Sequence, residues 1–498
     1  MSETARWLRE ASGADRVAAL GIGLGSLLAG EAIRAGASID DLILWAAPAQ
    51  GRSYLRELRL YSSAILGDED EPGPDSPVDA ISMGGFLLSR ESMDAISAAR
   101  ATLDDPAGRG RRVLMIGRDS GGVDETLRAS LVEGGADVTV VSTEGEYAAM
   151  MTSPDVSRLP TRTIGATVKW LTANASPGVT PRPLADAPGL SNSVSFEHEG
   201  QIIREQHVTL ETAAGALVGI LSQPVSCTPE PLCIITHNAG ALRRTSPGRS
   251  WTELCRHSAA RGLSALRVDL EGIGDSPGQF AANTRRGPED EQRTITSRME
   301  IADILERDQV ASRFIGVGQC LGAYWEMKAA VRDPRVRGIM LLNHLAFDWT
   351  PQLMREREMR AALGPLRRAL SSGPRALRQL LTVESIRTAG RGTALLLGGS
   401  VRAARRAQLS PALSQCDRLS SSGTRVLMMF SRNEVLFRQI RDLGLLKISA
   451  ARWPGIAVET LDTADHELRA ARIRADIHER FDVFVDQVLE ADLRAYGR

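Results

Sequence analysis

The second half of this 498-residue chain contains a cysteine, a glutamate and a histidine that could act together in one covalent reaction. Cys320 lies at the centre of the pentapeptide Gly318–Gly322, and Glu434 and His466 follow it in that order. A cysteine nucleophile needs a base that takes its proton and an acid that orients the base. We therefore predict Cys320 as nucleophile, His466 as base and Glu434 as acid.

Two further features of this chemistry are open to prediction. Asn433 and Asp465 neighbour Glu434 and His466, so they are alternatives for the orienting acid. The tetrahedral oxyanion of acyl transfer needs N–H donors. We expect one donor from the backbone of Leu321, and a second from Ala239 or Gly240. We interpret His237 and His344 as polar residues of a pocket wall.

The elements that must position these residues follow from the apolar pattern. An apolar run at 314–317 precedes Cys320 and a helical pattern at 323–331 follows it. Glycines on both sides of the cysteine permit the tight turn between strand and helix that exposes a nucleophile. Because strands alternate with helices, we predict a doubly wound, mostly parallel α/β sheet. The other strands are expected at 202–210, 216–221, 232–236, 265–268, 338–342, 426–430 and 457–461, and helices at 251–261, 298–306, 437–443 and 478–496.

The first half repeats part of this pattern without its chemistry. Gly21–Gly25 resembles the turn at Gly318–Gly322, but Gly23 occupies the nucleophile position, and residues 1–170 contain no histidine. We predict a truncated, inactive copy over 1–172, a Pro-, Ala- and Ser-rich linker over 173–198, and a complete domain over 199–498. Helices are expected at 2–12, 26–35 and 124–134, and strands at 16–20, 42–46, 113–116 and 138–141.

Residues 200–498 resemble the α/β-hydrolase superfamily, and within it the serine-aminopeptidase-like hydrolases that include enzymes of exopolysaccharide and natural-product biosynthesis. Four stretches carry the resemblance, in the expected order: Asn238–Gly240, Asp269–Ser276, Gly318–Gly322 and Ala464–His466. The resemblance implies an esterase, peptidase, thioesterase or acyltransferase. The thiol favours the last two, because thiols exchange readily with thioesters. For the first half, it places the missing histidine near Pro154–Asp155.

An arginine-rich stretch at about 350–410 lies where this superfamily inserts a helical cap. It holds twelve arginines, which we interpret either as a solvated helical face or as a surface for an anionic, carrier-bound acyl substrate such as coenzyme A or an acyl carrier protein. The arginines are Arg355, Arg357, Arg360, Arg367, Arg368, Arg375, Arg378, Arg387, Arg391, Arg402, Arg405 and Arg406.

The remaining features exclude other classes of protein. The formal net charge of -1 argues against nucleic-acid binding. Gly21-x-Gly23-x-Gly25 lacks the last glycine and the acidic residue of a dinucleotide site, and five cysteines without CxxC spacing predict no metal site. We therefore expect no cofactor, a cytoplasmic location and no membrane association. The alternative function is a non-catalytic scaffold.

The truncation has an architectural consequence. The strand at 16–20 is expected to present an open edge, because no earlier strand of the chain can pair with it. Open edges are usually covered. We expect coverage by the second half, by a partner in a homodimer, or by residues upstream of this start.

Overall fold

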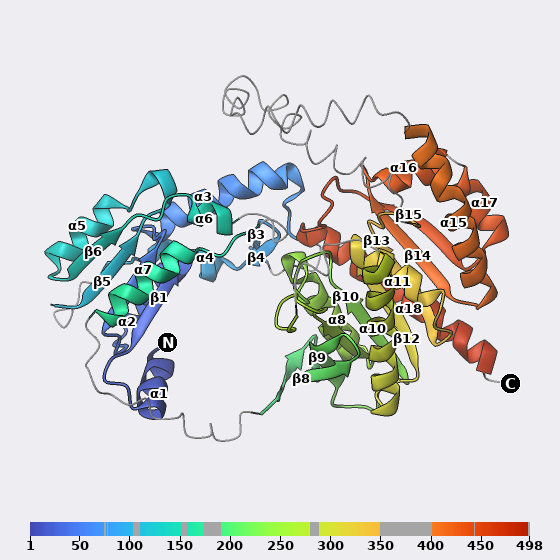
Figure 1. The fold of residues 1–498 in the computed structure, drawn as a ribbon, viewed down its shortest axis with the longest axis horizontal. Coiled ribbons are helices and arrows are strands. Elements are labelled where there is room, and N and C mark those ends of the chain that lie inside the picture. Colours follow the sequence, from blue (N-terminus) through green and yellow to red (C-terminus); the bar gives the residue numbers. More distant parts are fainter. Residues whose placement is uncertain are drawn as a thin grey trace. The chain divides into compact units, whose positions relative to one another are not determined.

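The computed structural model describes residues 1–73, 76, 78–102, 110–151, 157–173, 191–278, 288–348, 401–442 and 444–496. The chain divides into two compact units (Figure 1). The first is Met1–Val194 with Glu467–His478, and the second is Ser195–His466 with Glu479–Arg498. The division after Val194 falls inside the predicted linker, of which residues 174–190 lie outside the described part. The grouping of Glu467–His478 with the first unit has no signal in the sequence.

A mixed sheet forms the centre of the second unit. Its nine strands, counted over the described residues, have the order β15-β14-β13-β12-β10-β11-β9-β8-β7. Strands β10 to β15 are parallel, and the antiparallel hairpin β8–β9 joins them through β11. All residues of β10 and β11 are buried, as in parallel sheets with both faces covered. The strands are β7 (Ser193–His198), β8 (Gln201–Thr212), β9 (Gly215–Pro224), β10 (Leu232–His237), β11 (Ser264–Val268), β12 (Arg313–Gln319), β13 (Val336–Leu342), β14 (Arg425–Ser431) and β15 (Ile456–Leu461).

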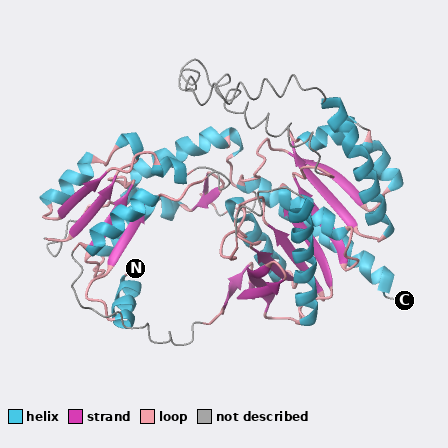
Figure 2. Cartoon of the chain, viewed as in Figure 1, coloured by secondary structure: helices cyan, strands magenta, loops and turns pink. Residues whose placement is uncertain are grey.

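Helices flank this sheet (Figure 2). The helix after Cys320 packs Ala323 and Met327 against buried residues of β13 and β14. On β13, Gly338 leaves room for Phe484 and Val488, since a Cβ there would lie 2.8 Å from Val488. The helices are α8 (Ser250–Ala260), α10 (Pro288–Arg307), α11 (Leu321–Ala330), α15 (Val401–Ser421), α16 (Val435–Asp442), α17 (Leu445–Arg452) and α18 (Ala471–Tyr496).

The first unit contains a smaller parallel sheet of order β1-β2-β5-β6. One face packs against α2 and α5 through residues such as Leu27 and Leu131, and the other against Tyr147 and Trp170 of α6 and α7. Its strands are β1 (Ala18–Ile22), β2 (Asp41–Trp45), β5 (Arg112–Ile116) and β6 (Asp137–Val141), beside a hairpin of β3 (Ile81–Met83) and β4 (Phe86–Leu88). Its helices are α1 (Ser2–Ser12), α2 (Leu24–Arg34), α3 (Gly51–Ile65), α4 (Arg90–Ala98), α5 (Glu125–Glu133), α6 (Glu146–Met150) and α7 (Thr161–Thr172).

Several predicted boundaries are wrong by a few residues. Strand β1 begins at Ala18 rather than Arg16. The N–H of Val17 donates to the Asp40 carboxylate and so does not take part in the strand pairing. Helices α10 and α18 begin ten and seven residues earlier than predicted. Their first turns carry charged residues that obscure the apolar period.

The predicted cap at 350–410 lies largely outside the described residues, which resume at the start of α15. Nine of the twelve arginines are therefore outside the described part, and Arg402, Arg405 and Arg406 belong to α15. None of the described helices combines the length and apolar character that crossing a membrane requires.

Candidate active site

Cys320 sits on a strained turn between β12 and α11. Its φ of 57° and ψ of -114° are unusual for a residue with a side chain, and its N–H donates to the carbonyl of Leu342 over 2.9 Å. A Cβ on Gly318 would lie 2.4 Å from Gly322. Glycine at 318 is therefore required for the turn to close, and the closed turn places the Cys320 side chain at the end of the parallel strands.

Three predicted residues from three loops come together here. Glu434 follows β14 and His466 follows β15. His466 Nδ1 lies 2.7 Å from Glu434 Oε1, and a second side-chain hydrogen bond joins His466 to Cys320. The Glu434 side chain is 14% exposed and that of His466 is 40% exposed. Of the three acids considered, Glu434 is the one that contacts the imidazole.

The electrostatics of this cluster favour a charged imidazole. Burial by itself lowers the pKa of His466, but the hydrogen bonds and negative charges of Cys320 and Glu434 raise that pKa to about 11. An opposite charge within hydrogen-bond distance stabilises the protonated ring. The arrangement therefore suits a thiolate–imidazolium pair at neutral pH.

Two side chains that the sequence analysis did not single out hold the histidine loop. Gln319 Nε2 and Asn343 Nδ2 both donate to the carbonyl of His466, over 3.0 and 2.8 Å. The Oδ1 atom of Asn343 also accepts the N–H of Ser431 over 2.8 Å. Asn343 thereby links the loops after β13, β14 and β15. The sequence signals for these supporting roles were the place of Gln319 directly before Cys320 and the place of Asn343 directly after β13.

The loop that follows β10 lies against the first turn of α11. A Cβ on Gly322 would lie 2.6 Å from the carbonyl oxygen of Asn238 and 3.0 Å from that of His237. Leu321 is the first residue of α11, so its N–H has no acceptor within the helix. The predicted donors of Leu321, Ala239 and Gly240 therefore belong to two segments in direct contact.

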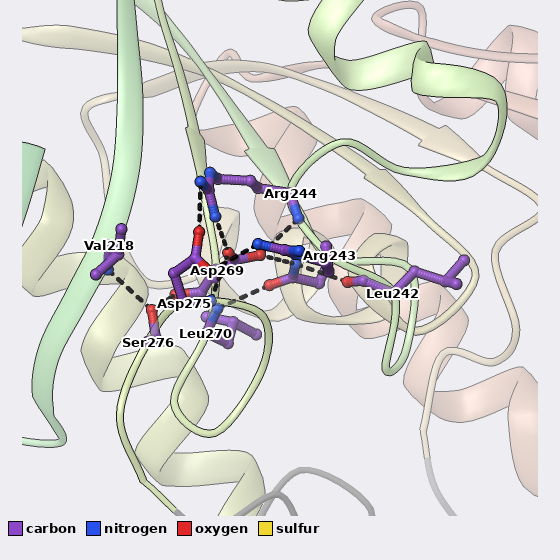
Figure 3. A network of polar contacts seen from close by, with 9 residues as sticks. Val218, Leu242, Arg243, Arg244, Asp269, Leu270, Asp275 and Ser276 are labelled. Carbon is purple, nitrogen blue, oxygen red and sulfur yellow. Dashed lines mark hydrogen bonds and ion pairs between the residues drawn. The ribbon is translucent and has the colours of Figure 1, made fainter. Parts of the chain in front are cut away.

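A buried carboxylate fastens this loop from its other side. Asp269, which is 0% exposed, accepts the backbone N–H of Arg244 over 2.5 Å and forms an ion pair with its guanidinium (Figure 3). Asn238 Nδ2 donates to Asp269 over 3.3 Å, and Asn238 Oδ1 accepts the N–H of Leu270 over 2.8 Å. The Asp269–Ser276 stretch, selected for its resemblance, thus supports the loop that follows β10.

The remaining candidates have other surroundings. Asp465 lies next to His466, and its N–H donates to Thr463. His344 is fully buried, and burial together with Lys328 lowers the pKa of its ring to about 3. His237 is also fully buried and contacts Glu326. Both histidines are therefore interior residues and not bases within reach of Cys320.

The first unit keeps the turn without the nucleophile. Gly23 has φ 53° and ψ -114°, nearly the angles of Cys320, and its N–H donates to the Trp45 carbonyl over 3.0 Å, as that of Cys320 does to Leu342. A Cβ on Gly21 would lie 2.5 Å from Ser26, which repeats the crowding at Gly318.

The acid and base positions of the first unit carry other residues. Asp119 follows β5 by three residues, as Glu434 follows β14, and Glu146 follows β6 by five, as His466 follows β15. Glu146 accepts the N–H groups of Arg162 and Thr163 at the start of α7. Burial opposes ionisation of Glu146, but these donors lower its pKa to about 2. Glu146 therefore has the spacing from β6 that His466 has from β15, and the predicted position near Pro154–Asp155 lies outside the described residues.

The sheet order, the turn at Cys320 and the chain order of Cys320, Glu434 and His466 are those expected of the α/β-hydrolase fold. The predicted superfamily resemblance and fold class are thereby confirmed at the level of the fold. The sequence itself matches no family model and no curated protein.

Solved structures that match part of this chain include proteins described as hydrolases and esterases. A putative α/β hydrolase of unknown function from Agrobacterium tumefaciens is 15% identical, with TM-score 0.35, over 58% of this chain and 98% of that one. A putative dienelactone hydrolase from Klebsiella pneumoniae is 12% identical, with TM-score 0.37, over 57% and 99%. A cold-adapted esterase from an Arctic intertidal metagenomic library is 12% identical, with TM-score 0.33, over 57% and 97%.

Proposed function

We propose that the second unit is an acyl-transfer enzyme with Cys320 as nucleophile, acting on an ester or thioester. The observation that carries the proposal is the position of His466, which hydrogen-bonds both Cys320 and Glu434. Nucleophile, base and orienting acid are the three groups that covalent acyl transfer needs. In a scaffold without chemistry, nothing would favour keeping this contact on a strained turn.

The reaction follows from these contacts. The Cys320 thiolate attacks the acyl carbon, and the N–H groups of Leu321 and of Ala239 or Gly240 stabilise the oxyanion. The intermediate collapses, and the leaving alcohol or thiol takes the proton of His466. An acceptor hydroxyl, amine or water then attacks the thioester while His466 removes its proton. Collapse of this second tetrahedral intermediate breaks the acyl–sulfur bond and expels the Cys320 thiolate, which restores the thiolate–imidazolium pair.

Within this reaction we favour a thioesterase or acyltransferase. A thioester on Cys320 exchanges readily with other thiols and is open to attack by amines. The arginine-rich stretch suits the phosphate groups of coenzyme A or an acidic acyl carrier protein. Exopolysaccharide or natural-product biosynthesis would supply such carrier-bound acyl groups. A carboxylesterase or peptidase would use the same three side chains.

The test is covalent labelling by an acyl-thioester probe. Intact-mass spectrometry of the protein with acyl-N-acetylcysteamine should show one acyl adduct, and peptide mapping should place it on Cys320. Turnover should fall by about 10³-fold or more in Cys320→Ala and His466→Ala. Glu434→Gln, which keeps size but loses charge, should fall less. No adduct and no turnover in the wild-type protein would leave the non-catalytic scaffold as the better interpretation.

We also propose that the first unit is a degenerate copy of the second. Its sheet order, the backbone angles at Gly23 and the spacing of Asp119 and Glu146 support this proposal. Gly23 has no side chain to acylate, and Glu146 is held by the start of α7. The acyl adduct should therefore be absent from residues 1–172.

A further inference from the structure

Three charged or polar side chains form a fully buried cluster around Glu326, six residues after Cys320 on α11. Glu326 lies on α11, His237 ends β10, and Arg298 lies on α10, each with a side chain no more than 1% exposed. His237 Nδ1 is 2.5 Å from Glu326 Oε1, and Arg298 Nε donates to the same oxygen over 3.1 Å. The acyl-transfer steps described above use none of the three.

The surroundings of Glu326 in this cluster favour its ionised form. Burial by itself raises the pKa of Glu326, but the charges of Arg298 and His237 and their hydrogen bonds lower it below its ordinary value. Glu326 is therefore an ionised acceptor neutralised by Arg298. The Nδ1–H of His237 donates to this carboxylate, which fixes the orientation of the ring.

Burying this cluster lowers the stability of the fold. Four of its polar atoms have no hydrogen-bond partner among the described residues: His237 Nε2, Glu326 Oε2, Arg298 Nη1 and Arg298 Nη2. A buried polar atom without a partner destabilises the fold, and apolar side chains commonly replace buried ion pairs without loss of stability. The carboxylate also demands glycine at 316, where a Cβ would lie 1.9 Å from Glu326 Oε2. Stability alone does not account for these residues.

The position of these three residues beside the loop that follows β10 offers a reason for keeping them. His237 is the residue from which that loop starts, and its carbonyl accepts Trp251 Nε1 over 2.9 Å. The carbonyls of His237 and Asn238 abut Gly322 in the first turn of α11. The ring of His237 is held by Glu326 further along the same helix. The loop is thus tied twice to the helix that carries Cys320 at its start.

We infer that Glu326, neutralised by Arg298, is a positioning residue that acts through His237 to set the oxyanion loop relative to Cys320. The inference rests on the proposed acyl transfer. A displacement of catalytic groups by about 1 Å can lower turnover on the order of 10²-fold. Loss of this tie should therefore reduce kcat and leave the thiolate and the substrate-binding surface in place.

The test compares His237→Leu, which removes the donor, with His237→Asn, whose amide can donate to Glu326 in place of Nδ1. Acylation by acyl-N-acetylcysteamine should show kcat lower by about 10²-fold in His237→Leu, with KM within about threefold. His237→Asn should recover most of kcat. Alkylation of Cys320 by iodoacetamide, which needs the thiolate but no oxyanion hole, should stay within about twofold in both variants.

A second variant guards against misfolding of the first. Arg298→Met with Glu326→Met removes both charges together, which offsets the loss of the acceptor for His237, so the variant should stay folded and yet show the reduced kcat of His237→Leu. Wild-type kcat in this double variant, or a parallel fall of acylation and alkylation in His237→Leu, overturns the inference. If the wild-type protein neither acylates nor turns over, it is the proposed function that fails.

Discussion

The groups around His466 favour a proton on its imidazole. Glu434 on one side and the cysteine sulfur on the other raise the pKa of His466 to about 11 from an ordinary value of 6.5. A raised histidine pKa means that the stabilisation is complete below about pH 6.5 and is lost as the pH rises through about 11. Over the neutral range we therefore expect a protonated His466 to favour the thiolate of Cys320.

The reactivity of Cys320 should consequently be almost independent of pH. The rate constant of its alkylation by iodoacetamide should change less than about threefold between pH 6.5 and 9, whereas an ordinary thiol gains about tenfold per pH unit below 8.5. Mass spectrometry of the Cys320 peptide gives the rate, and exposed Cys227 in the same sample is the reference. Glu434→Gln should slow alkylation at pH 7. A tenfold rise per pH unit in the wild-type protein would contradict the ion pair.

Asn343 gives a second prediction for a single side chain. Asn343→Ala removes the donor to the His466 carbonyl and the acceptor of the Ser431 N–H, so the free energy of unfolding should fall by about 1–3 kcal/mol. Turnover should also fall, because the histidine loop loses a support. Urea unfolding and acyl turnover at pH 7 measure both. Unchanged turnover would show that Gln319 alone suffices to hold the loop.

The two turns differ in what surrounds their helices. A methyl group at Gly322 meets the Asn238 and His237 carbonyls, whereas one at Gly25, the equivalent place in α2, meets nothing within 4 Å. Gly322→Ala should cost about 1–3 kcal/mol and most of the turnover, since the oxyanion loop must move. Gly25→Ala should be neutral or stabilising, because alanine is the better helix former. Equal effects of the two substitutions on unfolding and turnover would count against the contact.

Helices α8 and α18 are joined by a charge cluster around His257. Its Nδ1 lies 2.8 Å from Glu199 and its Nε2 lies 2.9 Å from Asp482, which also accepts from Arg261 over 2.7 Å. Burial lowers the pKa of His257, but Asp482 and Glu199 outweigh it and raise that pKa. The stabilisation is therefore complete below about pH 6.5 and is lost as the pH rises through the raised value.

This sign predicts how stability depends on pH. The difference in unfolding free energy between the wild-type protein and His257→Gln should shrink from pH 6 to pH 9, as measured by urea denaturation at both values. Arg261 stays charged over this range, so the change belongs to the histidine. A difference that is constant or grows with pH would show that His257 is not protonated in the folded protein.

The sequence predicted the strands, and it predicted that Cys320, Glu434 and His466 lie together, for a clear reason. The interior strands of a covered parallel sheet are apolar runs, and Cys320 and Glu434 follow two of them, whereas His466 follows the partly exposed edge strand β15. The supports escaped prediction, because Gln319 and Asn343 act by hydrogen bonds to a backbone carbonyl distant in sequence. The Glu326–His237 contact joins residues 89 positions apart, and no local pattern marks it.

At the scale of the whole molecule, the first unit has a sheet that ends at β1. Among the described residues, β1 pairs with β2 alone, and its side chains Leu20 and Ile22 are 55% and 39% exposed. A full sheet of this fold would place another strand there, as β10 lies beside β12. An apolar edge of this kind is prone to pair with other chains.

We therefore expect the β1 edge to be covered in solution. Amide hydrogen exchange in the intact chain should protect residues 18–22 as strongly as 112–116 of the interior strand β5. Analytical ultracentrifugation of the wild-type protein and of Leu20→Lys shows whether a second copy of the chain covers this edge. If it does, the wild-type protein is a dimer and Leu20→Lys dissociates it. Fast exchange at 18–22 in a stable monomer would show that the edge is bare.

The shared backbone angles of Gly23 and Cys320 carry one more consequence. A residue with a side chain in this conformation stores strain of about 1–3 kcal/mol, whereas glycine adopts it at little cost. The turn at Gly23 is thus free of the backbone strain that the turn at Cys320 carries. Comparing the two turns within one chain therefore shows how much folding free energy is lost when a reactive thiol is held in this conformation.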